Sequence, residues 1–157
     1  MLTFSSKPYR DLTCDELHDA FELRQRIFIV EQKWPYHDID GYDRDAVHLF
    51  GHDEAGVLVA YARLLPAGVK YAEPSIGRVA TSGAIRGTGT GKLLMRAAIA
   101  HARAAWGDVT LRIGAQRYVE RFYADLGFVP AGETYLEDGI PHVEMTLAPS
   151  RAGITSR

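Results

Sequence analysis

The chain has 157 residues, of which 46% are hydrophobic and 24% are charged. These are ordinary values for a single soluble globular domain, and they argue against a disordered, collagen-like or highly charged protein. The formal net charge of -2 argues against nucleic acid as the main partner, because phosphate binding usually shows as a basic excess.

The single cysteine, Cys14, limits the covalent and metal chemistry that the chain supports. One thiol forms neither an intrachain disulfide nor a cysteine-based zinc site. The first ten residues lack the charged-then-apolar pattern of a secretory leader, and no apolar run approaches the ~18 residues of a membrane span. We therefore expect a cytoplasmic protein without membrane contact.

The N-terminal half of the chain alternates between strand and helix patterns. A short strand is expected over residues 3–10, and a helix begins at Thr13, where Glu16 completes a capping box. Apolar residues then repeat at helical spacing until Pro35 ends the helix. After a polar loop, strands are expected at 47–51, 57–65 and 75–81, the first two joined as a hairpin.

The second half continues this alternation. Glycines at 87–91 precede a helical pattern over 92–106, which Gly107 ends. Further elements are expected as a strand at 109–113, a short helix at 117–126, a strand at 128–129 that extends toward Tyr135, and a strand at 142–147. Together the elements predict one α/β domain with a partly antiparallel sheet over residues 1–149, followed by a polar tail at 150–157.

The glycine-rich turn before the long helix is the most informative stretch. Glycines let the backbone approach a ligand, and a helix start adds unpaired N–H donors and the positive end of the helix dipole. This combination favours a phosphate or pyrophosphate site. A P-loop would need glycine in place of Arg86 and Ser or Thr in place of Leu93, and the dinucleotide fingerprint would need glycine in place of Lys92. A nucleotide-binding protein is therefore the weaker alternative.

A third phosphate pattern, Arg/Gln-x-x-Gly-x-Gly/Ala, is met by Arg86, Gly89 and Gly91. The stretch resembles motif A of the GNAT acyltransferases, whose glycine-rich loop holds the pyrophosphate of acetyl-CoA. Residues 115–128, with the pair Phe122-Tyr123, resemble motif B of the same family. Further short segments resemble the ElaA-type subgroup, at 31–32, 35–36, 38–41, 60–63 and 137–142.

This resemblance implies the GNAT fold, a twisted mixed sheet flanked by helices, and transfer of an acetyl group from acetyl-CoA directly to a primary amine. It assigns cofactor binding to the strand before the turn, to the turn and to motif B, that is to Val79, Ala80, Thr81, Arg86, Gly87, Thr88, Gly89, Thr90, Gly91, Lys92, Gln116 and Phe122. A free backbone N–H in the Val79–Ala80 region would polarise the thioester. Arg86 either reaches a phosphate or braces the loop.

The resemblance also suggests the groups that move protons. Motif B places the hydroxyl of Tyr123 near the cofactor sulfur, and a phenol that is protonated at neutral pH can donate to a departing thiolate. Tyr123 is therefore the predicted general acid, with a core tyrosine as the alternative. His142, after a proline at a strand start, and Glu31, acting through a water, are the favoured bases. Asp38, Asp40 and His48 are the other candidates.

The acidic loop has two alternative interpretations. Asp38, Asp40 and Asp43 either bind a cationic amine or form a solvated loop. We expect no metal there, because Ala46 and Val47 stand where a calcium loop needs a glutamate. The acceptor is expected to be a small-molecule or peptide amine, and the resemblance allows a homodimer. The alternative to an enzyme is a non-catalytic acyl-CoA-binding sensor or regulatory module.

Overall fold

One mixed sheet runs through the computed structural model, which describes residues 1–150. Its strand order is β1-β2-β3-β4-β5-β8-β6, and β7 pairs with β8. The strands are β1 (Thr3–Pro8), β2 (Val47–His52), β3 (Leu58–Leu65), β4 (Ser75–Thr81), β5 (Leu111–Gln116), β6 (Val129–Pro130), β7 (Tyr135–Glu137) and β8 (Ile140–Leu147). The predicted mixed α/β fold is confirmed.

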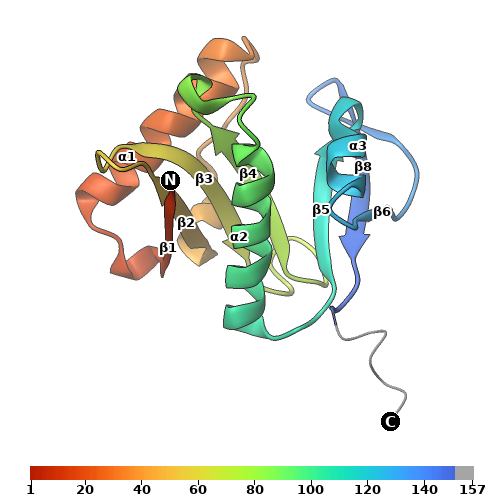
Figure 1. Ribbon diagram of the computed structural model, residues 1–157. Helices are drawn as coiled ribbons and strands as arrows, with labels where there is room; N and C mark the ends of the chain where they lie inside the picture. Colours follow the sequence, from red (N-terminus) through yellow and green to blue (C-terminus); the bar gives the residue numbers. More distant parts are fainter. Residues whose placement is uncertain (151–157) are drawn as a thin grey trace.

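The parallel contact between β4 and β5 is the exception in an otherwise antiparallel sheet. The two strands pair only at Ser75 and Arg112, where the Arg112 N–H donates to the Pro74 carbonyl over 2.9 Å. Beyond this point they diverge, and Figure 1 shows the separation between β4 and β5. The edge of β4 that faces β5 is therefore unpaired along most of its length.

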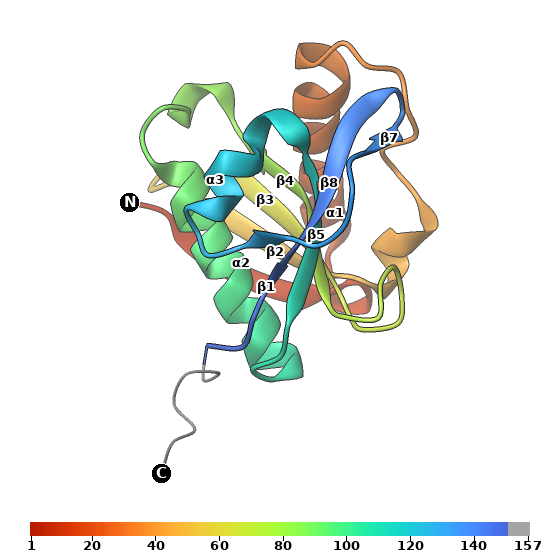
Figure 2. The same cartoon turned by 90° about the vertical axis from the view of Figure 1, so that its right-hand side faces the viewer.

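Two helices cover opposite faces of the sheet (Figure 2). Helix α1 (Cys14–Arg24) begins with the predicted capping box of Thr13 and Glu16. It packs on Phe50 and Tyr61, whereas α2 (Thr90–Trp106) packs on the other face of β3, against Ala60, Ala62 and Leu64. Alternate residues of β3 thus serve two separate cores, because side chains of a strand point to alternate faces.

Several predicted boundaries are shifted in the structure. The first helix continues as a π-helix, η2 (Gln25–Glu31), and the helix expected at 117–126 is a 3-10 turn, η5 (Arg117–Val119), followed by α3 (Glu120–Ala124). The strand expected at 109–113 starts at Leu111, because a turn in which the Val109 N–H donates to the Gly107 carbonyl occupies the preceding residues. Two further 3-10 turns are η1 (Tyr9–Asp11) and η4 (Gly83–Ile85).

The predicted polar tail lies outside the described residues from position 151 onward, and its first residue, Ser150, donates two hydrogen bonds to Asp108. Within residues 1–150, no helix has the length and apolar character needed to cross a membrane.

Candidate active site

A cavity of about 390 Å³ occupies the space between the diverging strands. Its wall includes residues of β4 and β5, of the η5–α3 segment, of the β7–β8 hairpin and of the segment that follows η2. The predicted site residues that line it are Val79, Thr81, Gly91, Gln116, Phe122, Tyr123 and His142. The cavity has the volume of a small-molecule site.

The glycine-rich turn enters α2 through two left-handed residues. Gly87 and Gly89 both have φ +80°, and a Cβ at either position would meet nothing within 4 Å. Gly91, in the first turn of α2, approaches Phe122 so closely that an added Cβ would lie 3.4 Å from its ring. Since the first N–H groups of a helix have no intrahelical acceptor, this open turn presents donors suited to an anion.

The threonines of the turn help to hold its shape. The Thr88 hydroxyl donates to the Ile85 carbonyl over 2.5 Å and lies 2.6 Å from the hydroxyl of Thr90. Thr90 is buried at the start of α2. Lys92 is 4.0 Å from a carboxylate oxygen of Asp125, the residue that follows α3, so it links the start of α2 to motif B.

Arg86 and Glu31 contact each other rather than the cavity. The Arg86 guanidinium donates to the Glu31 carboxylate and, over 3.2 Å, to the carbonyl of Thr81. Glu31 ends η2, so the pair fastens that segment to the glycine-rich turn. Of the two roles left open for Arg86, these contacts match the bracing one, and Glu31 does not line the cavity.

Tyr123 lies in α3 with its ring between two other aromatic rings. The rings of Phe122 and Phe128 meet it edge-on at centroid distances of 5.1 and 6.0 Å. Burial raises the pKa of Tyr123 to about 12. The phenol therefore carries its proton throughout the neutral range.

Ala80, a predicted cofactor-binding residue of β4, is 2% exposed and packs toward α1, away from the cavity.

His142 is buried in β8, opposite Gln116 of β5, and lines the cavity. Its Nδ1 lies 2.7 Å from the carbonyl oxygen of Ile140. A carbonyl only accepts, so in the neutral imidazole Nδ1 carries the hydrogen and Nε2 holds the lone pair. A carboxylate oxygen of Glu137 lies 3.8 Å from Nε2. In this arrangement Nε2 is the ring nitrogen that is able to accept a proton.

His48, another candidate base, is a structural residue. It is fully buried in β2, with Nδ1 2.7 Å from the Tyr61 hydroxyl and Nε2 2.9 Å from the Asp43 carbonyl. Burial holds its pKa below the usual range, and the ring does not line the cavity. The sequence could not separate it from His142, because both histidines occur in strands.

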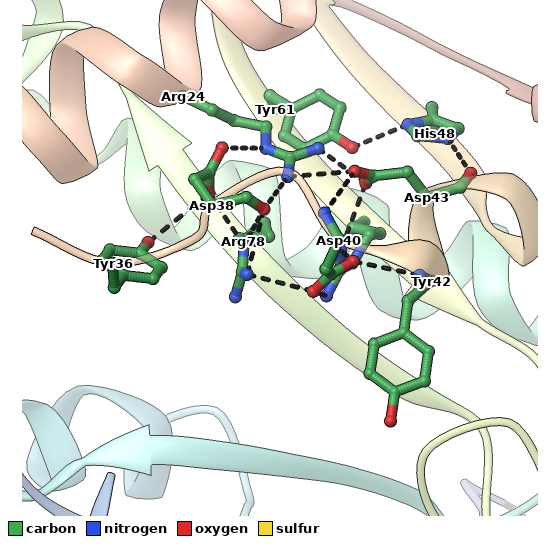
Figure 3. Close-up of polar contacts among 10 residues, drawn as sticks. Arg24, Tyr36, Asp38, Asp40, Tyr42, Asp43, His48, Tyr61 and Arg78 are labelled. Carbon is green, nitrogen blue, oxygen red and sulfur yellow. Dashed lines mark hydrogen bonds and ion pairs between the residues drawn. The ribbon is translucent and has the colours of Figure 1, made fainter. Parts of the chain in front are cut away.

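The acidic loop is part of a buried arginine–aspartate network, shown in Figure 3. Its charged members, which alternate in sign, are Arg24, Arg63, Arg78, Asp38, Asp40 and Asp43. Asp38 and Asp43 are only 7% and 2% exposed. The prediction of a solvated acidic loop is therefore wrong, and the carboxylates are already neutralised by the chain's own guanidinium groups rather than free for a cationic amine.

Asp43 is the centre of this network. One of its carboxylate oxygens accepts from Arg24 over 2.7 Å and from Arg63 over 3.1 Å. Burial opposes ionisation, but the hydrogen bonds and charges of the two arginines outweigh it and lower the pKa of Asp43. Asp38 and Asp40, the other two carboxylates, are bound by Arg78 over 2.8 and 3.2 Å.

Arg78 also marks an irregularity in β4. Its φ of +48° is rare for a residue with a side chain, and the register with β3 shifts at this point, between Tyr61 and Arg63. Neither Arg78 nor Val79 has a partner on β3. The bulge lies where β4 diverges from β5, so unpaired backbone faces the cavity there. Arg78 is not among the predicted site residues, although a charged residue within an apolar strand pattern was a signal.

This fold is shared by solved structures, among them an acyl-CoA N-acyltransferase. The chain belongs to the acetyltransferase (GNAT) domain family, whose model matches residues 24–149. The resemblance predicted from motifs A and B and from the ElaA-like segments is thereby confirmed.

Individual relatives cover almost the whole chain. It is 40% identical to a UPF0039 protein of Synechocystis, over 92% of this chain and 94% of that protein. It is 39% identical to the protein ElaA of Escherichia coli, over 92% and 95%. Among solved structures, an acyl-CoA N-acyltransferase of Pseudomonas aeruginosa has a TM-score of 0.88 at 41% identity, over 94% of this chain and all of that one. The crystal structure of Escherichia coli ElaA gives 0.85 at 37% identity, over 94% and 99%.

Proposed function

We propose that the protein transfers an acetyl group from acetyl-CoA to a primary amine, which attacks directly while both are bound. Membership of the GNAT family supports acyl transfer in general. The observation that carries the specific proposal is the continuity of the cavity, whose wall joins Gly91 at the start of α2 to Tyr123 and His142.

The residues of the site fit an acyl-CoA. The turn at Gly87 and Gly89 leaves open space for a diphosphate beside free helix N–H groups. The unpaired edge of β4 offers main-chain groups to an extended, amide-bearing arm, and Gln116 adds a side-chain amide to the same wall. Bound acetyl-CoA would supply an activated acyl group, and the free backbone at Arg78 and Val79 would polarise its carbonyl oxygen.

Tyr123 and His142 have complementary proton-transfer roles in this proposal. Tyr123 Oη holds a proton at neutral pH and gives it to the leaving sulfur. His142 Nε2 accepts a proton from the attacking amine, while its Nδ1–H stays bonded to the Ile140 carbonyl. Glu31 stays a predicted base, but its contact with Arg86 supports a bracing role instead.

The test is the conservative variant Tyr123→Phe, measured by thiol release from acetyl-CoA with a panel of amines. Loss of a general acid lowers kcat by roughly 10²–10⁴-fold. Calorimetric affinity for coenzyme A should be unchanged. Tyr9→Phe removes the same hydroxyl from a residue outside the cavity and should leave kcat unaltered. An unchanged rate in Tyr123→Phe rejects the acid role, and coenzyme A binding without thiol release from any amine favours the non-catalytic module.

A further inference from the structure

The arginine–aspartate network contributes unequal charge to the cavity wall, because only some of its members line the cavity. Arg63 and Arg78 both line the cavity, whereas none of the three aspartates that pair with them does. The network is neutral as a whole, but it presents its positive groups to the ligand space. Within residues 1–150, Arg63 Nε is buried without a hydrogen-bond partner, and every hydrogen bond and ion pair of Arg78 uses Nε or Nη2. In Figure 3 the remaining nitrogen of Arg78 carries no dashed line.

Lys70 adds a third positive group to this wall. It lies in the β3–β4 connection, and its Nζ is 5.5 Å from the ring centroid of Tyr71. In the part of the chain that the structure describes, no carboxylate lies within 4 Å of Nζ. Lys70 is the only lysine in the cavity wall formed by described residues. The charge of Glu137 acts on Lys70 without forming an ion pair with Nζ, so this cation is still suited to a negatively charged ligand group in the cavity.

A short series of aromatic contacts connects Lys70 with His142. The hydroxyls of Tyr71 and Tyr135 are neighbours, because they lie 3.0 and 2.9 Å from the position of a Cβ at Gly114. The ring of Tyr135 in turn lies 5.8 Å from that of His142, centroid to centroid. Lys70 and His142 therefore belong to neighbouring parts of one wall.

The acidic groups of the cavity gather at the His142 end. Glu137 lies 3.8 Å from His142 Nε2, and Asp138 follows it in the β7–β8 hairpin. An ammonium or amine is favoured beside these carboxylates, and an anion is favoured beside Lys70 and Arg78. The cavity wall therefore carries groups of both signs, and a polyamine would match it poorly, because its second cation would face Lys70 or Arg78.

We propose that the acceptor is a small amine that also carries an anionic group, as an amino acid does, with the anion held by Lys70 and Arg78 and the amine beside His142. This inference rests on the proposed function and specifies its acceptor. It replaces the expectation that the acidic loop selects a cation, since the network already occupies those aspartates.

The test compares acceptors that differ only in charge. L-amino acids are each paired with their carboxamides, O-phosphoethanolamine is paired with ethanolamine, and kcat/KM is measured by thiol release from acetyl-CoA. In the pair that contains the best acceptor, we expect kcat/KM of the charged member to exceed that of the uncharged member by at least roughly tenfold. This is the worth of one charge-assisted hydrogen bond. Preference for the phosphate would identify the anion as phosphate, whereas preference for the carboxamides or ethanolamine overturns the inference.

Variants of Lys70 test whether this residue of the cavity wall causes the preference for charged acceptors. Lys70→Met should lower kcat/KM for the charged acceptor by roughly 10–100-fold and leave its uncharged partner unaffected. Lys70→Arg should retain the preference. Lys7→Met, which removes a lysine on β1 outside the cavity, should behave as the unaltered protein. An equal loss for both acceptors in Lys70→Met contradicts anion recognition.

A binding measurement separates this inference from the proposed function. The preferred amino acid is titrated calorimetrically into protein saturated with coenzyme A. Heat that is present in the unaltered protein and lost in Lys70→Met supports the anion site even where no amine is acetylated. Absence of heat for every charged acceptor, with thiol released from uncharged amines, overturns the inference and leaves the acetyltransferase intact.

Discussion

Asp43→Asn should remove a large part of the stability of the domain at neutral pH. The Asp43 side chain is 3% exposed and is shared by two guanidinium groups, 2.7 Å from Arg24 and 3.1 Å from Arg63. The amide has no charge, and its NH2 group would face Arg24 Nη2, a donor that now bonds to the second carboxylate oxygen over 3.3 Å. Breaking a buried pair by changing one partner costs about 3–5 kcal/mol, because a charge is left buried without compensation. That is a large share of the roughly 5–15 kcal/mol of an ordinary domain.

The loss should also depend on pH in a defined direction. The pKa of Asp43 is lowered in the folded state, so its contribution is complete above the pKa of an unfolded aspartate, ~3.9, and disappears as the pH falls through the folded value. The difference between Asp43→Asn and the unaltered protein should therefore be constant from pH 7 to about 5 and shrink below pH ~4.

Urea unfolding followed by circular dichroism, from pH 7 to pH 3, measures both effects. Asp19→Asn makes the same chemical change at a side chain on α1 that is 57% exposed, and surface changes of this kind usually stay within about 0.5 kcal/mol. If Asp43→Asn lost no more stability than Asp19→Asn, the network would contribute no net electrostatic stabilisation and the reasoning would be refuted.

The remaining predictions concern the cofactor turn and the proton-transfer groups. Gly89→Ala forces a side chain to φ +80° at a cost of about 1–2 kcal/mol, so calorimetry should show coenzyme A binding weakened roughly 5–30-fold, whereas Gly41→Ala, in open space without a positive φ, should not change it. His142→Gln should lower kcat at least 100-fold in the thiol-release assay, and Glu31→Gln less than threefold because an exposed ion pair is worth ~0.5 kcal/mol; the reverse order would identify Glu31 as the base. Because the pKa of Tyr123 is about 12, ionisation of this acid should not reduce kcat between pH 7 and 10, and a decline in that range that Tyr123→Phe abolished would contradict the assignment.

The features that the sequence predicted well depend on residues close together in the chain. The capping box of Thr13 and Glu16 spans three residues, and it appears as expected. Gly87 and Gly89 adopt the left-handed conformation that a glycine-rich turn suggests, and Gly127 ends the motif B helix as predicted. Such local preferences hold in many tertiary contexts, so they could be interpreted before the fold was known.

The arginine–aspartate network was missed because its partners are distant in sequence. Arg24 binds Asp43 across 19 positions, and Arg78 binds Asp40 across 38. A polar loop rich in aspartates, such as residues 37–45, is typical of an exposed segment. Only the convergence of α1, β3 and β4 buries its carboxylates. Burial of a charge is a property of the assembled sheet and helix layers, so no local pattern indicates it.

The network also connects the β4 backbone that would polarise the acyl carbonyl with the cavity wall that would contact the acceptor. Arg78 keeps an unfavourable φ of +48°, a conformation that costs of order 1–3 kcal/mol and persists only where its surroundings hold it. Here Asp38 and Asp40 hold the side chain, and the ring of Tyr36 lies 5.4 Å from the centre of its guanidinium. The loop that carries these aspartates, and whose Tyr36 lines the cavity, thus fixes the bulge at which β4 exposes its backbone. Because one set of ion pairs positions both, disturbance of the loop should displace the backbone that polarises the acyl carbonyl as well as the groups that contact the acceptor.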